Sequence, residues 1–132
     1  MTDAPSIFTR IIKREIPAEI IYEDDHCIVI PDKFPSMSGQ LLVIPKTQVS
    51  YIGNLSDEAY THLMTVVRKS MYALDTGLGT IRTCVIIEGF EVPHVHVRLY
   101  PCFTSELILE PRHEATEESI LTLAATIRPY FN

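Results

Sequence analysis

Residues 92–100, in which polar and apolar side chains alternate, constrain the fold of this chain more than any other segment. Successive side chains of an extended strand point to opposite faces. One face therefore carries the imidazoles of His94 and His96 and the guanidinium of Arg98, roughly 7 Å apart in succession. The apolar residues between them form the other face, which can pack against a helix. The segment predicts a β-strand with one apolar face and one cationic, histidine-bearing face.

Two imidazoles and a guanidinium on one strand face favour a site that binds an anion. Arginine is a permanent cation whose donors fit phosphate oxygens. A neutral imidazole can act as a nucleophile without a separate base. Together these groups favour phosphoryl or nucleotidyl transfer, provided that the face lines a pocket that substrate can enter. The alternative is an ordinary surface strand whose polar side chains face water, which alternation alone also allows.

A metal site is a further alternative, since a His-x-His pair on a strand can chelate zinc or iron. Such a site needs a third and usually a fourth ligand. Residues 99–103 supply no carboxylate, and Arg98 would put a cation beside the metal. The thiols of Cys27, Cys84 and Cys102 are far apart in the sequence and form no Cys-x-x-Cys pair. We therefore expect no metal and no cofactor.

Hydrophobic periodicity and turn residues predict the remaining elements. Three helices are expected. The first covers residues 7–14 and the last covers residues 116–127; the middle one begins after an N-cap at Ser56 and stops at Gly77 and Gly79. Strands are expected over residues 20–23, 27–31, 41–45, 82–87 and 92–100. Hairpins, rather than regular strand–helix–strand alternation, indicate an α+β fold with an antiparallel sheet.

Length and charge limit the partners of the chain. The 132 residues suit one domain, residues 1–132, and a net charge of −6 disfavours a polynucleotide partner. The longest apolar runs, residues 27–30 and 41–44, are far below the roughly 20 residues that a membrane span needs. The first residues have neither the basic start nor the apolar run of a signal peptide. We expect a cytoplasmic protein that acts on a small anionic ligand, with no membrane partner.

Five blocks of the sequence, in order, resemble the histidine-triad (HIT) family. Residues 94–100, His-Val-His-Val-Arg-Leu-Tyr, resemble the family's His-φ-His-φ-His-φ-φ signature, in which φ is apolar, with Arg98 in place of the third histidine. The other four blocks are residues 7–18, residues 22–25, the loop with Asp32, Pro35 and Gly39, and residues 42–46. The resemblance covers about residues 6–101, so that residues 102–132 would be a C-terminal extension with an extra helix.

The resemblance implies a HIT-like α+β fold, an antiparallel meander sheet with flanking helices, in a homodimer. It implies a nucleotide-binding hydrolase or transferase that attacks the α-phosphate of a small nucleotide-derived substrate through a nucleotidyl-histidine intermediate. His96 corresponds to the family's nucleophile, and the carbonyl oxygen of His94 would accept the proton of its Nδ1 atom. Asp32 corresponds to the ligand of the ribose hydroxyls. Four residues correspond to the base pocket, with plain core packing as their alternative: Ile7, Phe8, Ile11 and Ile30.

Three positions near the expected phosphate site depart from the family pattern. Arg98 replaces a histidine and is expected to bind phosphate together with His94. Gln48 stands where the family often has a histidine; it is expected to contact phosphate, but it cannot titrate. Glu91 stands where a small hydroxyl residue is frequent, and its carboxylate would repel phosphate unless Arg98 or a metal offsets it. These changes leave open a second function, a nucleotide-binding module that has lost turnover.

Overall fold

The computed structural model describes residues 4–131, in which five strands form one antiparallel sheet in the spatial order β1-β2-β3-β5-β4. The strands are β1 (Tyr22–Glu23), β2 (Cys27–Pro31), β3 (Leu41–Pro45), β4 (Arg82–Ile86) and β5 (Val97–Cys102). The helices are α1 (Ile7–Ile12), α2 (Asp57–Leu78) and α3 (Glu117–Ile127), with short 3-10 helices at Ile52–Asn54 and Arg128–Tyr130. The predicted α+β class, the antiparallel sheet and the extra C-terminal helix are confirmed.

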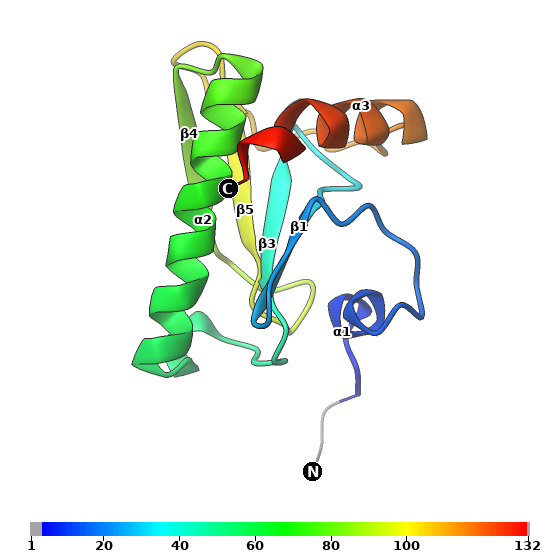
Figure 1. The fold of residues 1–132 in the computed structure, drawn as a ribbon, viewed down its shortest axis with the longest axis vertical. Helices are drawn as coiled ribbons and strands as arrows, with labels where there is room; N and C mark the ends of the chain where they lie inside the picture. Colours follow the sequence, from blue (N-terminus) through cyan, green and yellow to red (C-terminus); the bar gives the residue numbers. More distant parts are fainter. Residues whose placement is uncertain (1–3, 132) are drawn as a thin grey trace.

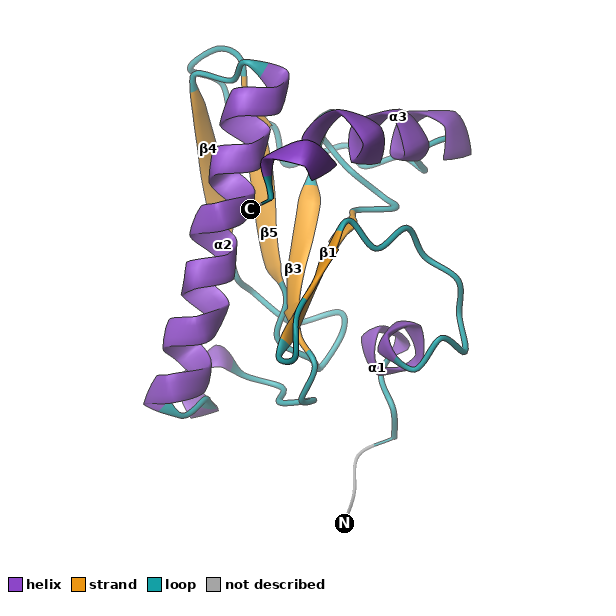
Figure 2. Cartoon of the chain, viewed as in Figure 1, coloured by secondary structure: helices purple, strands orange, loops and turns teal. Residues whose placement is uncertain are grey.

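Both faces of the sheet are covered by helices, α2 along one face and α1 beside the other (Figures 1 and 2). Leu41 and Val43 of β3 belong to the core cluster that contains the buried residues of α2. The alternate side chains, Leu42 and Ile44, belong to a second cluster that contains Phe8 of α1. Strand β3 is therefore buried on both faces and central in the sheet, as its continuous apolar sequence predicts.

Helix α2 begins and ends at signals that the sequence offers. The hydroxyl of Ser56 caps its first turn, where Asp57 adds a negative charge that suits the helix dipole. The helix ends at Gly79, whose φ of 73° is left-handed. The predicted stop at Gly77 is wrong, because this glycine lies inside α2, where a Cβ atom would approach the side chain of Ile127 to 3.1 Å. No helix among residues 4–131 is both long and apolar enough to cross a membrane.

The second hairpin differs from its predicted form. Strands β4 and β5 pair antiparallel as expected, but β5 begins at Val97 rather than at residue 92. Pro93 has no N–H to donate to a strand ladder, and the N–H of His94 donates back to the carbonyl oxygen of Val92 at 2.8 Å. The connection therefore spans residues 87–96, and both histidines lie in its last part, directly before β5.

Between β5 and α3, the chain returns along the loop that follows β2. The N–H of His113 donates to the carbonyl oxygen of Pro35 at 3.2 Å, and the N–H of Ala115 donates to that of Lys33 at 2.8 Å. Helix α3 then begins after its N-cap, Thr116, and lies across one end of the sheet (Figure 1). The C-terminal extension thus brings residues 108–115 beside the loop that carries Asp32.

Candidate active site

His94 and His96 lie on the sheet face that α1 covers. Both contact the ring of Phe8, with ring centroids 5.8 Å apart for His94 and 4.9 Å apart for His96. Arg98 lies opposite Leu42 of β3, which packs in the cluster around Phe8. The alternate residues of the segment join the core cluster on the α2 face. The predicted common face of two imidazoles and a guanidinium is therefore present.

The side chain of His94 is held on both of its ring nitrogens. Its Nε2 lies 2.7 Å from the carbonyl oxygen of Pro45, which can only accept, so Nε2 carries the proton and donates. The other nitrogen, Nδ1, then accepts a hydrogen bond from the hydroxyl of Ser6 at 2.7 Å. Burial lowers the pKa of His94, against the effect of the Pro45 hydrogen bond. The imidazole of His94 is therefore neutral at pH 7, and its position is fixed.

His96 is oriented by the backbone of His94. Its Nδ1 lies 2.7 Å from the carbonyl oxygen of His94 and donates to it, which leaves the lone pair on Nε2. Burial lowers the pKa of His96, and the positive charge of Arg98 lowers it further, although the hydrogen bond to the His94 carbonyl raises it. A neutral imidazole with a free Nε2 lone pair is the form that can attack phosphorus.

The two imidazoles are almost completely buried, with exposed fractions of 0% for His94 and 1% for His96. The expectation that this face opens into a pocket is therefore not met. Among the buried side-chain nitrogen and oxygen atoms of residues 4–131, two lack a hydrogen-bond partner: Nε2 of His96 and Nε of Arg98. Buried polar atoms are rarely left unpaired, because each costs about 1–3 kcal/mol. These two unpaired atoms lie on the same face, two residues apart.

The guanidinium of Arg98 is held beside the histidines with little counter-charge. Its side chain is 12% exposed, and its nearest carboxylate, that of Glu88, lies at 4.0 Å. A pair at that separation leaves most of the guanidinium's donors free for another anion. The face thus combines a neutral nucleophile with a buried cation.

Asp32 follows β2 in a rigid turn. Its Oδ1 accepts a hydrogen bond from the N–H of Phe34 at 2.9 Å, and its Oδ2 accepts one from the side-chain amide of Gln40 at 2.6 Å. The amide oxygen of Gln40 in turn accepts a hydrogen bond from the N–H of Ser36 at 3.1 Å. Gln40 is 1% exposed and fixes the carboxylate, a role that no sequence signal indicated.

The four expected base-pocket residues do not all come together. Phe8, Ile11 and Ile30 are buried in one cluster on the α1 face, whereas Ile7 is 49% exposed. The packing of Ile11 and Ile30 is that of core residues, which is the alternative stated above. Phe8 differs from them because its ring also covers both imidazoles.

Gln48 holds the start of α1 against His94. Its Oε1 accepts hydrogen bonds from the N–H of Ser6 at 2.8 Å and from the hydroxyl of Thr9 at 2.7 Å, and its Nε2 donates to the carbonyl oxygen of Ala4 at 2.9 Å. Both polar atoms of the amide therefore contact α1 or the residues that lead into it. Ser6 is both the N-cap of α1 and the donor to His94, so the link between helix and histidine depends on it. A serine in the N-cap position is the signal that indicates its capping role.

Arg112 of the C-terminal extension reaches the segment that precedes the histidines. Its guanidinium contacts the carboxylate of Glu91 at 2.8 Å, and this contact lowers the pKa of Glu91. The negative charge that the sequence places near the expected phosphate site is thus paired with a cation 21 residues away in the chain. No local pattern in the sequence indicates this pair.

Two clefts lie close to the expected ligand residues. One, of about 490 Å³, is lined by residues at and after α1, among them Ile11 and Ile16. The other, of about 640 Å³, lies between the loop after β2, the C-terminal extension and α3, and Asp32 is among its lining residues. His96 lines neither cleft.

Comparisons with known proteins agree with this architecture. A family model described as "HIT domain" matches residues 13–104. An uncharacterised HIT-like protein of Synechocystis sp. is 35% identical over 99 residues, which are 71% of this chain and 87% of that protein. An uncharacterised HIT-like protein of Methanocaldococcus jannaschii is 30% identical over 104 residues, 76% of this chain and 81% of that protein.

Solved structures are similar over almost the whole chain. A HIT-like protein of Bartonella henselae, described as involved in cell-cycle regulation, has a TM-score of 0.89 at 25% identity and covers 98% of each chain. A hypothetical histidine triad nucleotide-binding protein of Sulfolobus tokodaii has a TM-score of 0.84 at 25% identity, covering 94% of this chain and 90% of its own. The similarity therefore includes the C-terminal helix α3.

Proposed function

The chain belongs to the HIT domain family, and on this premise we propose that it is a hydrolase or transferase of a nucleotide-derived compound, with His96 as its nucleophile. One observation carries the proposal: Nε2 of His96 and Nε of Arg98 are the two unpartnered buried atoms of the described side chains, and they share one face. A phosphate between them would accept from the guanidinium and present phosphorus to the imidazole lone pair.

In the proposed reaction, Nε2 of His96 forms a bond to the α-phosphorus while the bond from phosphorus to the leaving group breaks. The Nδ1 proton stays on the ring, where the His94 carbonyl oxygen stabilises the positive charge that develops. Arg98 stabilises the negative charge on the non-bridging oxygens. Water, or another acceptor, then attacks the nucleotidyl-histidine; with water, the nucleoside monophosphate is released and His96 is regenerated.

The remaining residues would hold the nucleoside and build the site. We propose that Asp32 binds the ribose hydroxyls and that Phe8, with its neighbours Ile7, Ile11 and Ile30, receives the base. We propose that His94 and Gln48 serve phosphate binding mainly by position, because the groups that both side chains offer are engaged with α1 and β3. Access to His96 would require the Phe8 ring to move, since that ring contacts both imidazoles.

The alternative is a nucleotide-binding module without turnover, and the burial of His96 favours it. The two functions differ in a direct measurement. We expect purified protein to release nucleoside monophosphate from adenosine or guanosine phosphoramidates, and His96→Gln to abolish release while nucleotide still raises the thermal stability of the protein. No release by the unaltered protein from any such compound, together with stabilisation by nucleotide, would favour the binding module.

We also propose that residues 1–132 form a single HIT domain and that two copies form a homodimer. In the described part of the chain, β1 and β4 are the edge strands of the sheet, and an edge offers unpaired backbone groups to a second copy. Light scattering at several protein concentrations measures the mass of the assembly directly.

A further inference from the structure

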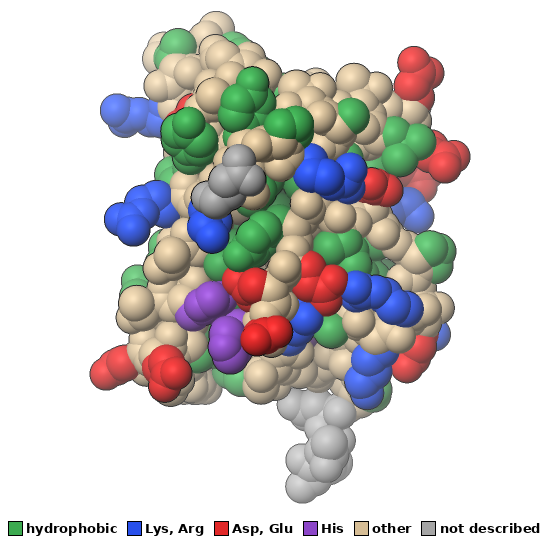
Figure 3. Space-filling view, in the orientation of Figure 1, with side chains coloured by type: hydrophobic (Ala, Val, Ile, Leu, Met, Phe, Trp, Pro, Cys, Tyr) green, Lys and Arg blue, Asp and Glu red, His purple; other side chains and the backbone are tan. Residues whose placement is uncertain are grey.

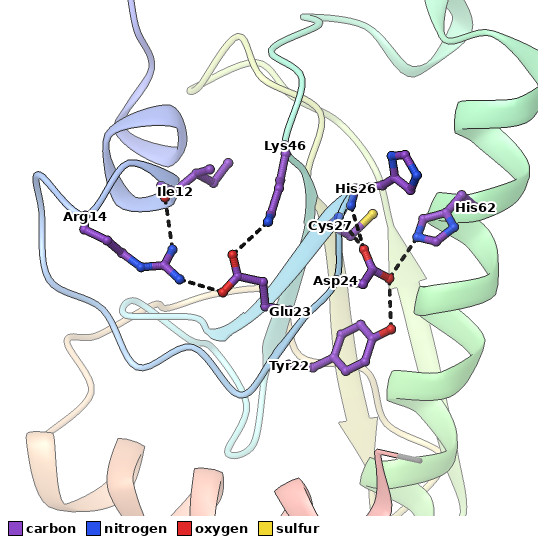
Figure 4. Close-up of polar contacts among 9 residues, drawn as sticks. All are labelled: Ile12, Arg14, Tyr22, Glu23, Asp24, His26, Cys27, Lys46 and His62. Atoms are coloured by element: carbon purple, nitrogen blue, oxygen red, sulfur yellow. Dashed lines mark hydrogen bonds and ion pairs between the residues drawn. The ribbon is translucent and has the colours of Figure 1, made fainter.

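A second group of chemically reactive side chains lies on the α2 side of the molecule, away from His96. Asp24 and His26 come from the turn between β1 and β2, Cys27 is the first residue of β2, and the fourth member, His62, comes from α2 (Figure 4). Cys27 packs in the core cluster of the α2 face, whereas Phe8 and the active-site imidazoles lie on the α1 face. The group is therefore separate from the proposed active site.

Ligand atoms of three different kinds converge in this group. One carboxylate oxygen of Asp24, the sulfur of Cys27 and a ring nitrogen of His62 all lie within 4.8 Å of one another. The ring of His26 lies edge-on to that of His62, with centroids 4.8 Å apart. In the space-filling view, histidine side chains adjoin acidic ones on the face shown (Figure 3). Sequence separation hides the group, because His62 follows Asp24 by 38 positions in the chain.

The two oxygens of Asp24 have different partners. Oδ1 accepts from the backbone N–H groups of His26 and Cys27, both at 2.8 Å, and thereby fixes the turn. Oδ2 faces α2 and accepts from the Tyr22 hydroxyl and from Nε2 of His62, both at 2.9 Å. These four hydrogen bonds hold the carboxylate in place, with Oδ2 turned toward α2. The protein's own hydrogen bonds thus fix the turn.

The nearby carboxylate of Glu23 is already paired. Glu23, the neighbour of Asp24, points to the other side of β1, where its carboxylate contacts Lys46 at 2.8 Å and Arg14 (Figure 4). In contrast, Cys27 is 1% exposed and its thiol forms no disulfide. A buried cation beside the thiol would supply the charge that makes a thiolate stable there.

We propose that this group is a structural site for one zinc ion, bound by Asp24 Oδ2, Cys27 Sγ and a ring nitrogen of His62, with the exposed imidazole of His26 as the fourth ligand. Bond lengths of about 2.0–2.3 Å in a tetrahedral site set the ligand atoms roughly 3.3–3.7 Å apart. The three atoms from Asp24, Cys27 and His62, all within 4.8 Å of one another, need only small shifts to reach that spacing. The exposed ring of His26, which lies beside that of His62, would have to turn toward them to complete the site. Sulfur and imidazole ligands favour zinc over magnesium or calcium, which prefer cages of oxygen atoms.

Binding leaves the protons in balance. The Cys27 thiol releases its proton to solvent and binds as thiolate. His62 binds as a neutral imidazole through the nitrogen that now donates to Asp24, and its proton moves to the other ring nitrogen. The metal would then connect the β1–β2 turn to α2, which at present are joined there by the His62–Asp24 hydrogen bond. It would stabilise the fold without touching the face that carries His96.

The test is a titration of the chelator-treated protein, residues 1–132, with Zn²⁺ by calorimetry and with Co²⁺ by absorption spectroscopy. We expect one equivalent of metal, a thiolate-to-cobalt charge-transfer band and a raised thermal unfolding midpoint in Zn²⁺. His62→Gln should weaken binding at least about tenfold and remove the thermal shift. This variant keeps a partly exposed side chain on α2, so it should fold even if Cys27→Ser does not.

Two further variants locate the metal. His96→Gln tests the His-x-His pair and should leave metal binding unchanged. His113 lies on the C-terminal extension, and His113→Gln should also leave metal binding unchanged. The proposal is overturned if Zn²⁺ neither binds nor shifts the midpoint, if His62→Gln binds as tightly as the unaltered protein, or if His96→Gln is the variant that loses the metal.

Discussion

The Nδ1 atom of His96 lies 2.7 Å from the carbonyl oxygen of His94, two residues earlier in the chain. Because a carbonyl oxygen only accepts, this contact fixes the proton on Nδ1 and leaves Nε2 as a free base. The same His94 is held in place by Ser6 on α1 and by the Pro45 carbonyl on β3. The tautomer of the proposed nucleophile therefore depends on contacts between three separate elements of the fold.

The link from α1 to His94 makes Ser6 more important than an ordinary helix cap. Ser6→Ala should lower the free energy of unfolding by about 2–3 kcal/mol, since it removes the cap and leaves Nδ1 of buried His94 with only the more distant Thr9 hydroxyl, at 3.4 Å. Ser56→Ala is the matched control, because Ser56 caps α2 without contacting a buried histidine, and should cost only about 1 kcal/mol. Denaturant unfolding measures both; equal losses would mean that the hydrogen bond to His94 contributes nothing.

Burial of His94 and His96 predicts a pH dependence of stability. Both pKa values are lowered from 6.5 in the folded state, so the unfolded chain takes up protons at a higher pH than the folded protein does. The free energy of unfolding should therefore fall as the pH drops below about 6.5, until the folded imidazoles also protonate. His96→Gln removes one of the two groups and should give a shallower fall. Urea unfolding at several pH values checks this, and an unchanged slope in His96→Gln would contradict it.

Arg98 should act on turnover more than on folding. Arg98→Gln removes a charge from the proposed transition state and should lower kcat about 10²–10³-fold. Arg98→Lys keeps the charge but loses the fork of donors, so its kcat should lie between that of the unaltered protein and that of Arg98→Gln. Steady-state kinetics separates kcat from KM, and thermal unfolding monitors the fold. If Arg98→Gln raises KM but leaves kcat unchanged, Arg98 binds substrate without stabilising the transition state.

The ion pair between Glu91 and Arg112 should affect nucleotide affinity but leave the stability of the fold nearly unchanged. Arg112→Gln would leave the Glu91 carboxylate unpaired near the phosphate site and should weaken nucleotide binding several-fold. The ion pair is exposed, so the free energy of unfolding should change by less than about 1 kcal/mol. Glu91→Gln in the same protein should restore affinity, which a double-mutant cycle measures. Additive effects of the two substitutions would show that the pair does not influence the ligand.

The sequence predicts those features that depend on local pattern. Alternation from residue 92 onward places His94, His96 and Arg98 on one face, and the apolar run at β3 marks the central strand, because side-chain direction follows from strand geometry alone. The start of β5 was predicted five residues too early, since Pro93 and the turn at His94 interrupt the ladder without breaking the alternation.

Contacts between distant residues could not be predicted in the same way. Ser6 meets His94 across 88 residues, and Arg112 meets Glu91 across 21. Each pair depends on how α1 or the C-terminal extension packs on the sheet, which no spacing in the sequence encodes. The burial of His96 has the same origin, because the Phe8 ring that covers it belongs to α1.

The central claim is that Nε2 of His96 bonds covalently to the α-phosphorus of a nucleotide. Rapid denaturation of the protein during turnover of a nucleoside phosphoramidate, without acid, followed by peptide mass spectrometry, tests it directly. We predict a nucleoside monophosphate adduct on His96 that His96→Gln cannot form. Turnover that proceeds with no adduct on His96, or with an adduct on another residue, would contradict the claim.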